Sequence, residues 1–125
     1  MIVNFKKLKE IAEIEFWDIV EDVILTDINE LRIILKDNSF IEIWYSLKLK
    51  RRYSYHWERR HIDGTMYRHD NAPHKNWKNI STFPKHFHEG EEERVVESHI
   101  SEKPEEGIRE FLNFAKEKLK EQEVK

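Results

Sequence analysis

All seven histidines of this 125-residue chain lie between positions 56 and 99. An imidazole has an unperturbed pKa of about 6.5, so a histidine cluster is typical of sites that transfer protons or bind metal ions near neutral pH. The densest stretches are residues 67–74 and 81–88, and each also contains a proline and a cationic side chain. We therefore interpret these two segments as the candidate functional site.

One chemistry that suits these residues is RNA cleavage without a metal ion. One imidazole would accept the proton of a ribose 2′-hydroxyl, a second would protonate the leaving oxygen, and a cation would stabilise the phosphorane. The acid–base candidates are His69, His74 and His86, and Asp70 would orient an imidazole as the carboxylate of a catalytic triad does. The candidates for substrate binding and charge stabilisation are Arg68, Asn71, Lys85, Arg51 and Arg52.

Two alternatives use the same residues. His86 and His88 are two positions apart, so on an extended segment both imidazoles would face one side, as metal ligation requires, and His74 or Asp70 would complete the site of a metal-dependent hydrolase. In a non-catalytic binding or structural protein, these side chains would instead satisfy backbone groups of a proline-bounded loop. We expect no bound metal or other cofactor, because the chain has no cysteine and the His-x-His pair supplies only two obvious ligands.

The composition excludes several classes of protein. Charged residues make up 38% of the chain but leave a net charge of only −3, which favours an ion-paired surface over a strongly basic polyanion-binding one. The absence of cysteine excludes disulfides and thiolate chemistry. A single glutamine among many Lys and Glu residues is typical of hyperthermophile proteins. We find neither the apolar run of a signal peptide nor the roughly 20 apolar residues of a membrane span, and expect a cytoplasmic protein.

The pattern of hydrophobic residues predicts a single α+β domain over residues 1–125. Helical spacing over residues 5–14 follows a capping Asn4. Strands are expected at residues 15–26, 30–36, 40–47, 51–60 and 66–70, with tight turns at 37–39 and 63–64. Residues 71–93 lose all periodicity and are expected to form a long functional loop. Val95 and Val96 suit a short edge strand, and Pro104 suits the first turn of a closing helix.

The expected architecture is an antiparallel meander of about four to six strands, flanked by an N-terminal and a C-terminal helix. The strand at 51–60 places Tyr53, Tyr55 and Trp57 on one face. Because basic residues surround these rings, they are candidates for stacking RNA bases, although alternating aromatics are more often core. One sheet edge and the histidine-rich loop are expected to form the cleft.

Three ordered blocks resemble a prokaryotic family of domains that includes the TumE-type toxins. The blocks are residues 53–57 (Tyr-Ser-Tyr-His-Trp), 67–74 (Tyr-Arg-His-Asp-Asn-Ala-Pro-His) and 81–86 (Ser-Thr-Phe-Pro-Lys-His), followed by Glu97-Ser98. Where many members have a second histidine after the one matching His74, this chain has Lys75. The resemblance implies the toxin of a toxin–antitoxin pair, with a cognate antitoxin as its partner. Because many such toxins are ribonucleases, RNA is the expected substrate.

Overall fold

A seven-stranded antiparallel sheet forms the frame of the protein, and the computed structural model describes residues 2–123. The strands lie in chain order, so that β1 forms one edge and β7 the other. Their bounds are β1 (Val20–Asp27), β2 (Glu30–Leu35), β3 (Phe40–Tyr45), β4 (Tyr53–Arg59), β5 (Thr65–Asp70), β6 (His86–Gly90) and β7 (Val95–Glu97). Each strand thus pairs with its chain neighbours, which antiparallel strands joined by short turns do readily.

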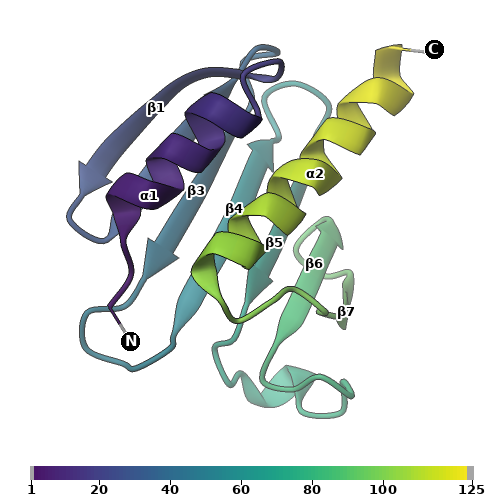
Figure 1. Cartoon of the computed structure of the whole chain (residues 1–125). Coiled ribbons are helices and arrows are strands. Elements are labelled where there is room, and N and C mark those ends of the chain that lie inside the picture. Colours follow the sequence, from purple (N-terminus) through teal and green to yellow (C-terminus); the bar gives the residue numbers. More distant parts are fainter. Residues whose placement is uncertain (1, 124–125) are drawn as a thin grey trace.

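Both long helical segments cover the same face of this sheet, and within the described residues 2–123 no α-helix covers the other face (Figure 1). The first segment is α1 (Phe5–Glu10), which continues directly into the π-helical stretch η1 (Ile11–Glu15). The second is α2 (Pro104–Glu123). Arg109 of α2 donates two hydrogen bonds to the Glu15 carboxylate at 2.7 and 2.8 Å, and so ties the two segments together.

The core lies between the helices and the sheet, and every second residue of β2, β3 and β4 enters it. Tyr53, Tyr55 and Trp57 are 2%, 0% and 0% exposed, and the ring of Tyr55 packs edge-on against Phe111 of α2. Large aromatic rings remove much apolar surface from water when they are buried, and so contribute strongly to the stability of a core. These three rings are therefore core, and the idea that they stack RNA bases is wrong.

One charged side chain belongs to this core. The Arg59 side chain is 1% exposed, and its guanidinium bonds Asp37 at 2.5 Å, Asp63 at 3.2 Å and Gln122 at 2.9 Å while lying over the Trp57 ring. Burial alone would raise the pKa of Asp37, but hydrogen bonds from Ser39 and Arg59 outweigh it and hold that pKa below its ordinary value. Arg59 thus joins a hairpin, a turn and the end of α2.

The predicted elements agree with the structure in class and order, and differ in two places. The first strand begins at Val20 rather than Glu15, because residues 16–19 form a turn that closes η1. The segment 71–93 is not one loop: it contains a short 3-10 helix, η2 (Lys75–Trp77), and the strand β6. With β6 and β7 the sheet has seven strands, more than the four to six expected. The sequence of β6, His-Phe-His-Glu-Gly, lacks the polar–apolar alternation that indicates a half-buried strand.

Helix α2 approaches the sheet so closely at Gly107 that a side chain has no room there. A Cβ built on Gly107 would lie 2.7 Å from the Tyr55 hydroxyl oxygen and 3.1 Å from the carbonyl oxygen of Ser101. The Tyr55 hydroxyl is itself held by a hydrogen bond to the Tyr45 hydroxyl inside the core. Gly107 therefore sets the distance between α2 and β4.

We predict that Gly107→Ala destabilises the protein, although alanine is the better helix former by about 1 kcal/mol. Overpacking of a core typically costs about 1–3 kcal/mol, so the free energy of unfolding should fall. Chemical denaturation measures the change. Asn113→Ala, an exposed position of the same helix, is the matched control and should be neutral or slightly stabilising. An equal increase in the free energy of unfolding of both variants would contradict the close contact at Gly107.

Candidate functional site

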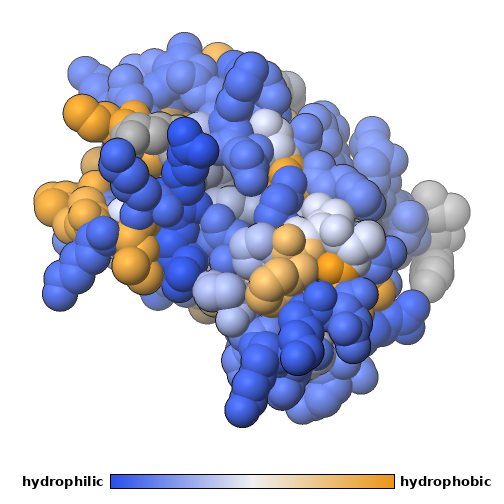
Figure 2. All heavy atoms as spheres, turned by 90° about the horizontal axis from the view of Figure 1, so that it is seen from below, coloured by the Kyte–Doolittle hydropathy of each residue, from blue (hydrophilic) through white to orange (hydrophobic). Residues whose placement is uncertain are grey.

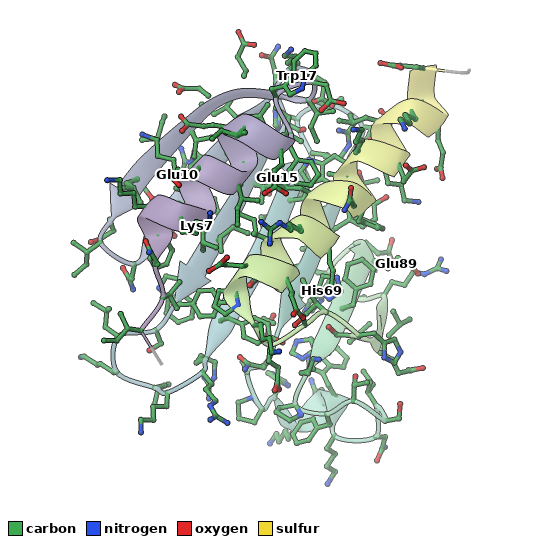
Figure 3. The ribbon with its side chains drawn as sticks, in the orientation of Figure 1. Lys7, Glu10, Glu15, Trp17, His69 and Glu89 are labelled. Carbon is green, nitrogen blue, oxygen red and sulfur yellow. The ribbon has the colours of Figure 1, made fainter. Side chains whose placement is uncertain are left out.

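The alternation of side chains along β5 divides the predicted site residues between the two faces of the sheet. Successive side chains of a strand point to opposite faces. Arg68 and Asp70 therefore share the face without helices, and His69 points toward α2 (Figure 3). The neighbouring strand β6 pairs His86 with Asp70 and His88 with Arg68, so both histidines lie on the face of Asp70.

A carboxylate and two imidazoles meet on this face. The Nε2 atom of His86 lies 3.1 Å from Asp70 Oδ1, and the Nε2 atom of His88 lies 3.8 Å from Asp70 Oδ2. The side chains of His86 and His88 are only 3% and 5% exposed, and that of Asp70 is 13% exposed. Asp70 Oδ1 also accepts a hydrogen bond from the Ala72 amide at 3.0 Å, which fixes the end of β5.

Both imidazoles are oriented by backbone carbonyls. His86 Nδ1 lies 2.9 Å from the carbonyl oxygen of Pro84, and His88 Nδ1 lies 2.7 Å from that of Glu92. A carbonyl oxygen can only accept, so each Nδ1 carries a proton and donates it. Each Nε2 is then left to face Asp70.

The environments move the pKa values of the two histidines in opposite directions. Burial alone would lower the pKa of His86, but its bonds to Asp70 and to the Pro84 carbonyl outweigh burial and raise it. Burial dominates for His88 and lowers its pKa. Burial would raise the pKa of Asp70, but the hydrogen bond and charge of His86 lower it. Opposed shifts within one pair of groups are typical of sites that transfer protons.

Arg68 is part of a charge network and is not a free cation. Its Nε donates to Asp70 Oδ2 at 3.2 Å, and its two terminal nitrogens donate to the two Glu92 carboxylate oxygens at 3.0 and 2.7 Å. Such a bidentate pair fixes the guanidinium in one orientation. Arg68 therefore holds Asp70 and the loop after β6 in place.

These groups line an open cavity of about 450 Å³. Small-molecule and substrate sites commonly have volumes of about 300–1,000 Å³. His74 and Trp77, from the segment around η2, form its other side. The Trp77 ring centroid lies 5.7 Å from that of His74, 6.2 Å from that of His86 and 6.1 Å from that of His88. His74 Nδ1 accepts a hydrogen bond from the Asn76 amide, so a neutral His74 carries its proton on Nε2.

His69 does not belong to this cavity, which corrects the expectation that His69, Asp70, His74 and His86 converge. Its imidazole stacks on Phe87 with 4.2 Å between ring centroids, and its Nδ1 lies 2.7 Å from the Ser98 hydroxyl oxygen. Burial lowers the pKa of His69 to about 3, so this imidazole stays neutral near neutral pH. Asp70, His74 and His86 do line one cavity, and His88 joins them.

The predicted substrate-binding residues have separate positions. Asn71 bridges two segments: its side chain accepts from the Tyr53 amide at 2.9 Å and donates to the Arg51 carbonyl at 2.6 Å. Lys85 donates to the carbonyl oxygen of Ile100 at 2.5 Å, away from the cavity. Arg51 and Arg52 lie in the loop between β3 and β4, which Asn71 joins to the end of β5. Seen from below, the surface is hydrophilic over most of its area, with smaller hydrophobic groups at the left and right of centre (Figure 2).

Within the described residues 2–123, no helix is both long and apolar enough to cross a membrane. The same part of the chain contains one group of three or more His, Asp or Glu residues with converging ligand atoms, and that group is Asp70, His86 and His88. The sequence alone indicates His88 only as half of a His-x-His pair. The signal that both histidines share a face was correct, because β6 is extended.

We predict that His69→Ala lowers stability more than His74→Ala. His69 is half-buried and packs against Phe87 and Phe111, and truncating a packed side chain of this kind typically costs about 1–3 kcal/mol. His74 is exposed, and its loss should cost about 1 kcal/mol or less. Urea denaturation of both variants at neutral pH measures the difference, and equal losses would contradict the two placements.

Comparison with known proteins identifies one family. The family model of the toxin TumE matches residues 5–119, nearly the whole chain, from the first residue of α1 to the last turns of α2. No curated protein and no solved structure matches the chain. Because the match covers α1, all seven strands, every residue of the cavity and most of α2, the chain belongs to the TumE toxin family.

Proposed function

We propose that this protein is the toxin of a toxin–antitoxin pair and that it cleaves RNA in the cavity formed by Asp70, His86, His88 and His74. Membership of the TumE toxin family supports the toxin role. The observation that carries the choice of site is the convergence of two oriented imidazoles on one nearly buried carboxylate beside an open cavity. A buried charged cluster of this kind is costly to maintain unless it is fully paired, and is typical of functional sites.

The cavity offers the groups that cleavage at a ribose 2′-hydroxyl requires. The His86 and His88 rings lie 5.0 Å apart between centroids, so one can accept a proton while the other donates one. His74, at the exposed rim, can donate from Nε2 to a phosphate oxygen. Trp77 lies beside all three imidazoles and supplies a ring on which a base can stack.

The sequence favours a metal-independent route, in which these side chains would cleave RNA without a metal ion. Asp70 would orient His86, as a carboxylate orients the imidazole of a triad. His69 has no part in this route, because it lies on the opposite face of the sheet. Metal-independent cleavage stays a prediction, and activity after treatment with a chelator tests it.

RNA would reach the cavity from the end of the sheet that carries the loop between β3 and β4. This loop contains the cations Lys48, Lys50, Arg51 and Arg52, and Asn71 joins it to the end of β5 next to Asp70. Lys and Arg side chains that contact phosphates supply most of the sequence-independent affinity for nucleic acid. Arg51 and Arg52 are thus proposed to bind the RNA backbone, and the antitoxin to block this access.

The non-catalytic alternative rests on a specific observation as well. Several histidines have internal partners: His61 bonds the Asn38 carbonyl, and His56 bonds Glu58. A purely structural cluster would make the same kind of contacts around Asp70. The two functions differ in what a conservative substitution does to activity when the fold is intact.

We predict that Asp70→Asn and His86→Gln each abolish growth inhibition by the induced protein. Loss of an acid–base group or of its orienting partner typically costs about 10²–10⁴-fold in rate, which is enough to silence a toxin. Growth after induction and cleavage of total RNA by purified protein are the measurements. His61→Gln, an exposed histidine outside the cavity, is the control and should remain fully toxic.

Thermal melts of the same variants decide between the two functions. Variants that keep a cooperative melt and lose RNA cleavage support the catalytic role. Full toxicity of folded Asp70→Asn and His86→Gln would contradict it, and the cluster would then be structural. Wild-type protein that inhibits growth without cleaving RNA would retain the toxin role and exclude RNA cleavage.

A further inference from the structure

We infer that Asp70, His86 and His88 bind one divalent transition-metal ion, of the class of Zn²⁺, on the face of the sheet without helices. One ligand atom from each of the three residues lies within 4.8 Å of the other two. The inference deepens the proposed function, on whose cavity it rests, by naming an ion for it. With the ion on their Nε2 atoms, His86 and His88 would be ligands and not acid–base groups, so a metal-dependent route would replace the metal-independent one. The geometry that carries the inference does not depend on RNA cleavage.

The separations of the ligand atoms suit such an ion. Zinc lies about 2.0–2.2 Å from imidazole nitrogen and carboxylate oxygen, so two ligands of a tetrahedral site are roughly 3.3 Å apart. His86 Nε2 lies 3.1 Å from Asp70 Oδ1 and His88 Nε2 lies 3.8 Å from Asp70 Oδ2, so each imidazole is near this separation from one of the two carboxylate oxygens. Small rotations of these side chains would complete the site.

His86 and His88 have the kind of hydrogen bond that orients metal-binding histidines. A ligating histidine almost always donates its other ring N–H to a carbonyl or carboxylate, which fixes the ring and its tautomer. His86 and His88 each do this with a backbone carbonyl, so their Nε2 atoms face the Asp70 carboxylate. A neutral imidazole presents a lone pair at Nε2, and a lone pair so close to a carboxylate oxygen requires a proton or a cation between them.

The charge of the cavity favours a cation with more than one charge. Its charged lining consists of Arg68 against the three carboxylates of Asp70, Glu92 and Glu93, and Arg68 is already paired with Glu92. Without a bound cation or a protonated imidazole, this surplus of negative charge would repel a phosphodiester. A divalent ion would reverse the sign of the potential at the point where a phosphate would lie.

The ligand set also indicates the type of ion and its use. Two imidazoles and one carboxylate suit zinc and the neighbouring first-row ions, whereas calcium and magnesium prefer oxygen ligands alone. Three protein ligands leave a coordination position open to water or substrate, as catalytic zinc sites do and structural ones do not. This inference departs from the sequence-based expectation of no bound metal, because Asp70 supplies a third ligand that spacing alone did not place.

Isothermal titration of the chelator-stripped full chain with Zn²⁺ tests the site. We expect one ion per chain, and at least about 100-fold weaker binding for Asp70→Asn and His86→Gln, since loss of an outer-shell partner alone typically costs 10–100-fold. His61→Gln should bind as wild type does. Co²⁺ in place of Zn²⁺ should give visible absorption bands that the two ligand variants lose.

Two results would overturn the metal site: no saturable binding of Zn²⁺ or Co²⁺ by the folded wild type, or wild-type binding by both folded ligand variants. Asp70→Asn keeps the shape of the side chain, so it decides the question where His86→Gln does not melt cooperatively. RNA cleavage is measured separately. Cleavage by protein that binds no ion would leave the proposed function in place without the metal, and ion binding without cleavage would leave the metal site without the ribonuclease.

Discussion

The candidate site depends on one constraint, the alternation of side chains along β5 and β6. This alternation matters because the long helices cover only one face of the sheet. Neighbouring residues of a strand face opposite environments. His69 therefore enters the apolar layer beneath α2, while Asp70 enters a polar cavity on the other face. A shift of one residue in the pairing of β5 with β6 would exchange these environments and would bury the wrong groups.

The pairing of β5 with β6 also brings together the groups that compensate the cost of burying the Asp70 carboxylate. A carboxylate that is mostly removed from water is costly unless other groups compensate its charge and its lone pairs. The Asp70 carboxylate accepts hydrogen bonds from the Ala72 amide and the Arg68 guanidinium, and its Oδ1 atom contacts His86 Nε2. Arg68 in turn binds Glu92, whose carbonyl orients His88. The site is thus one connected network, so its members are not independent in energy.

The two faces of the sheet separate the aromatic core from the candidate site. On the helix side, Tyr55, Trp57 and Phe111 form an aromatic core, and Gly107 lets α2 approach the sheet closely. Dense packing there leaves little freedom for the backbone of β4 and β5. The cavity on the other face therefore has a rigid floor, which a site needs in order to hold three groups at fixed separations.

Sequence patterns alone determined the class of fold, the order of most elements and the segments that carry the site. Helical spacing, tight-turn residues and period-two alternation are local properties, so α1, the hairpins from β1 to β5 and α2 could be predicted from neighbours in the chain. Only the tertiary structure decided which histidines meet. Strand β6 lacks a clear local signal, because it is short and its first three residues are buried on both faces. Without β6, the partners of Asp70 cannot be identified. His69 and Asp70 are adjacent in the chain, but their side chains lie on opposite faces of the sheet. Asp70 and His86 are sixteen residues apart, but they are paired on neighbouring strands. Strand register, and not distance along the sequence, therefore decides which side chains are in contact in a sheet.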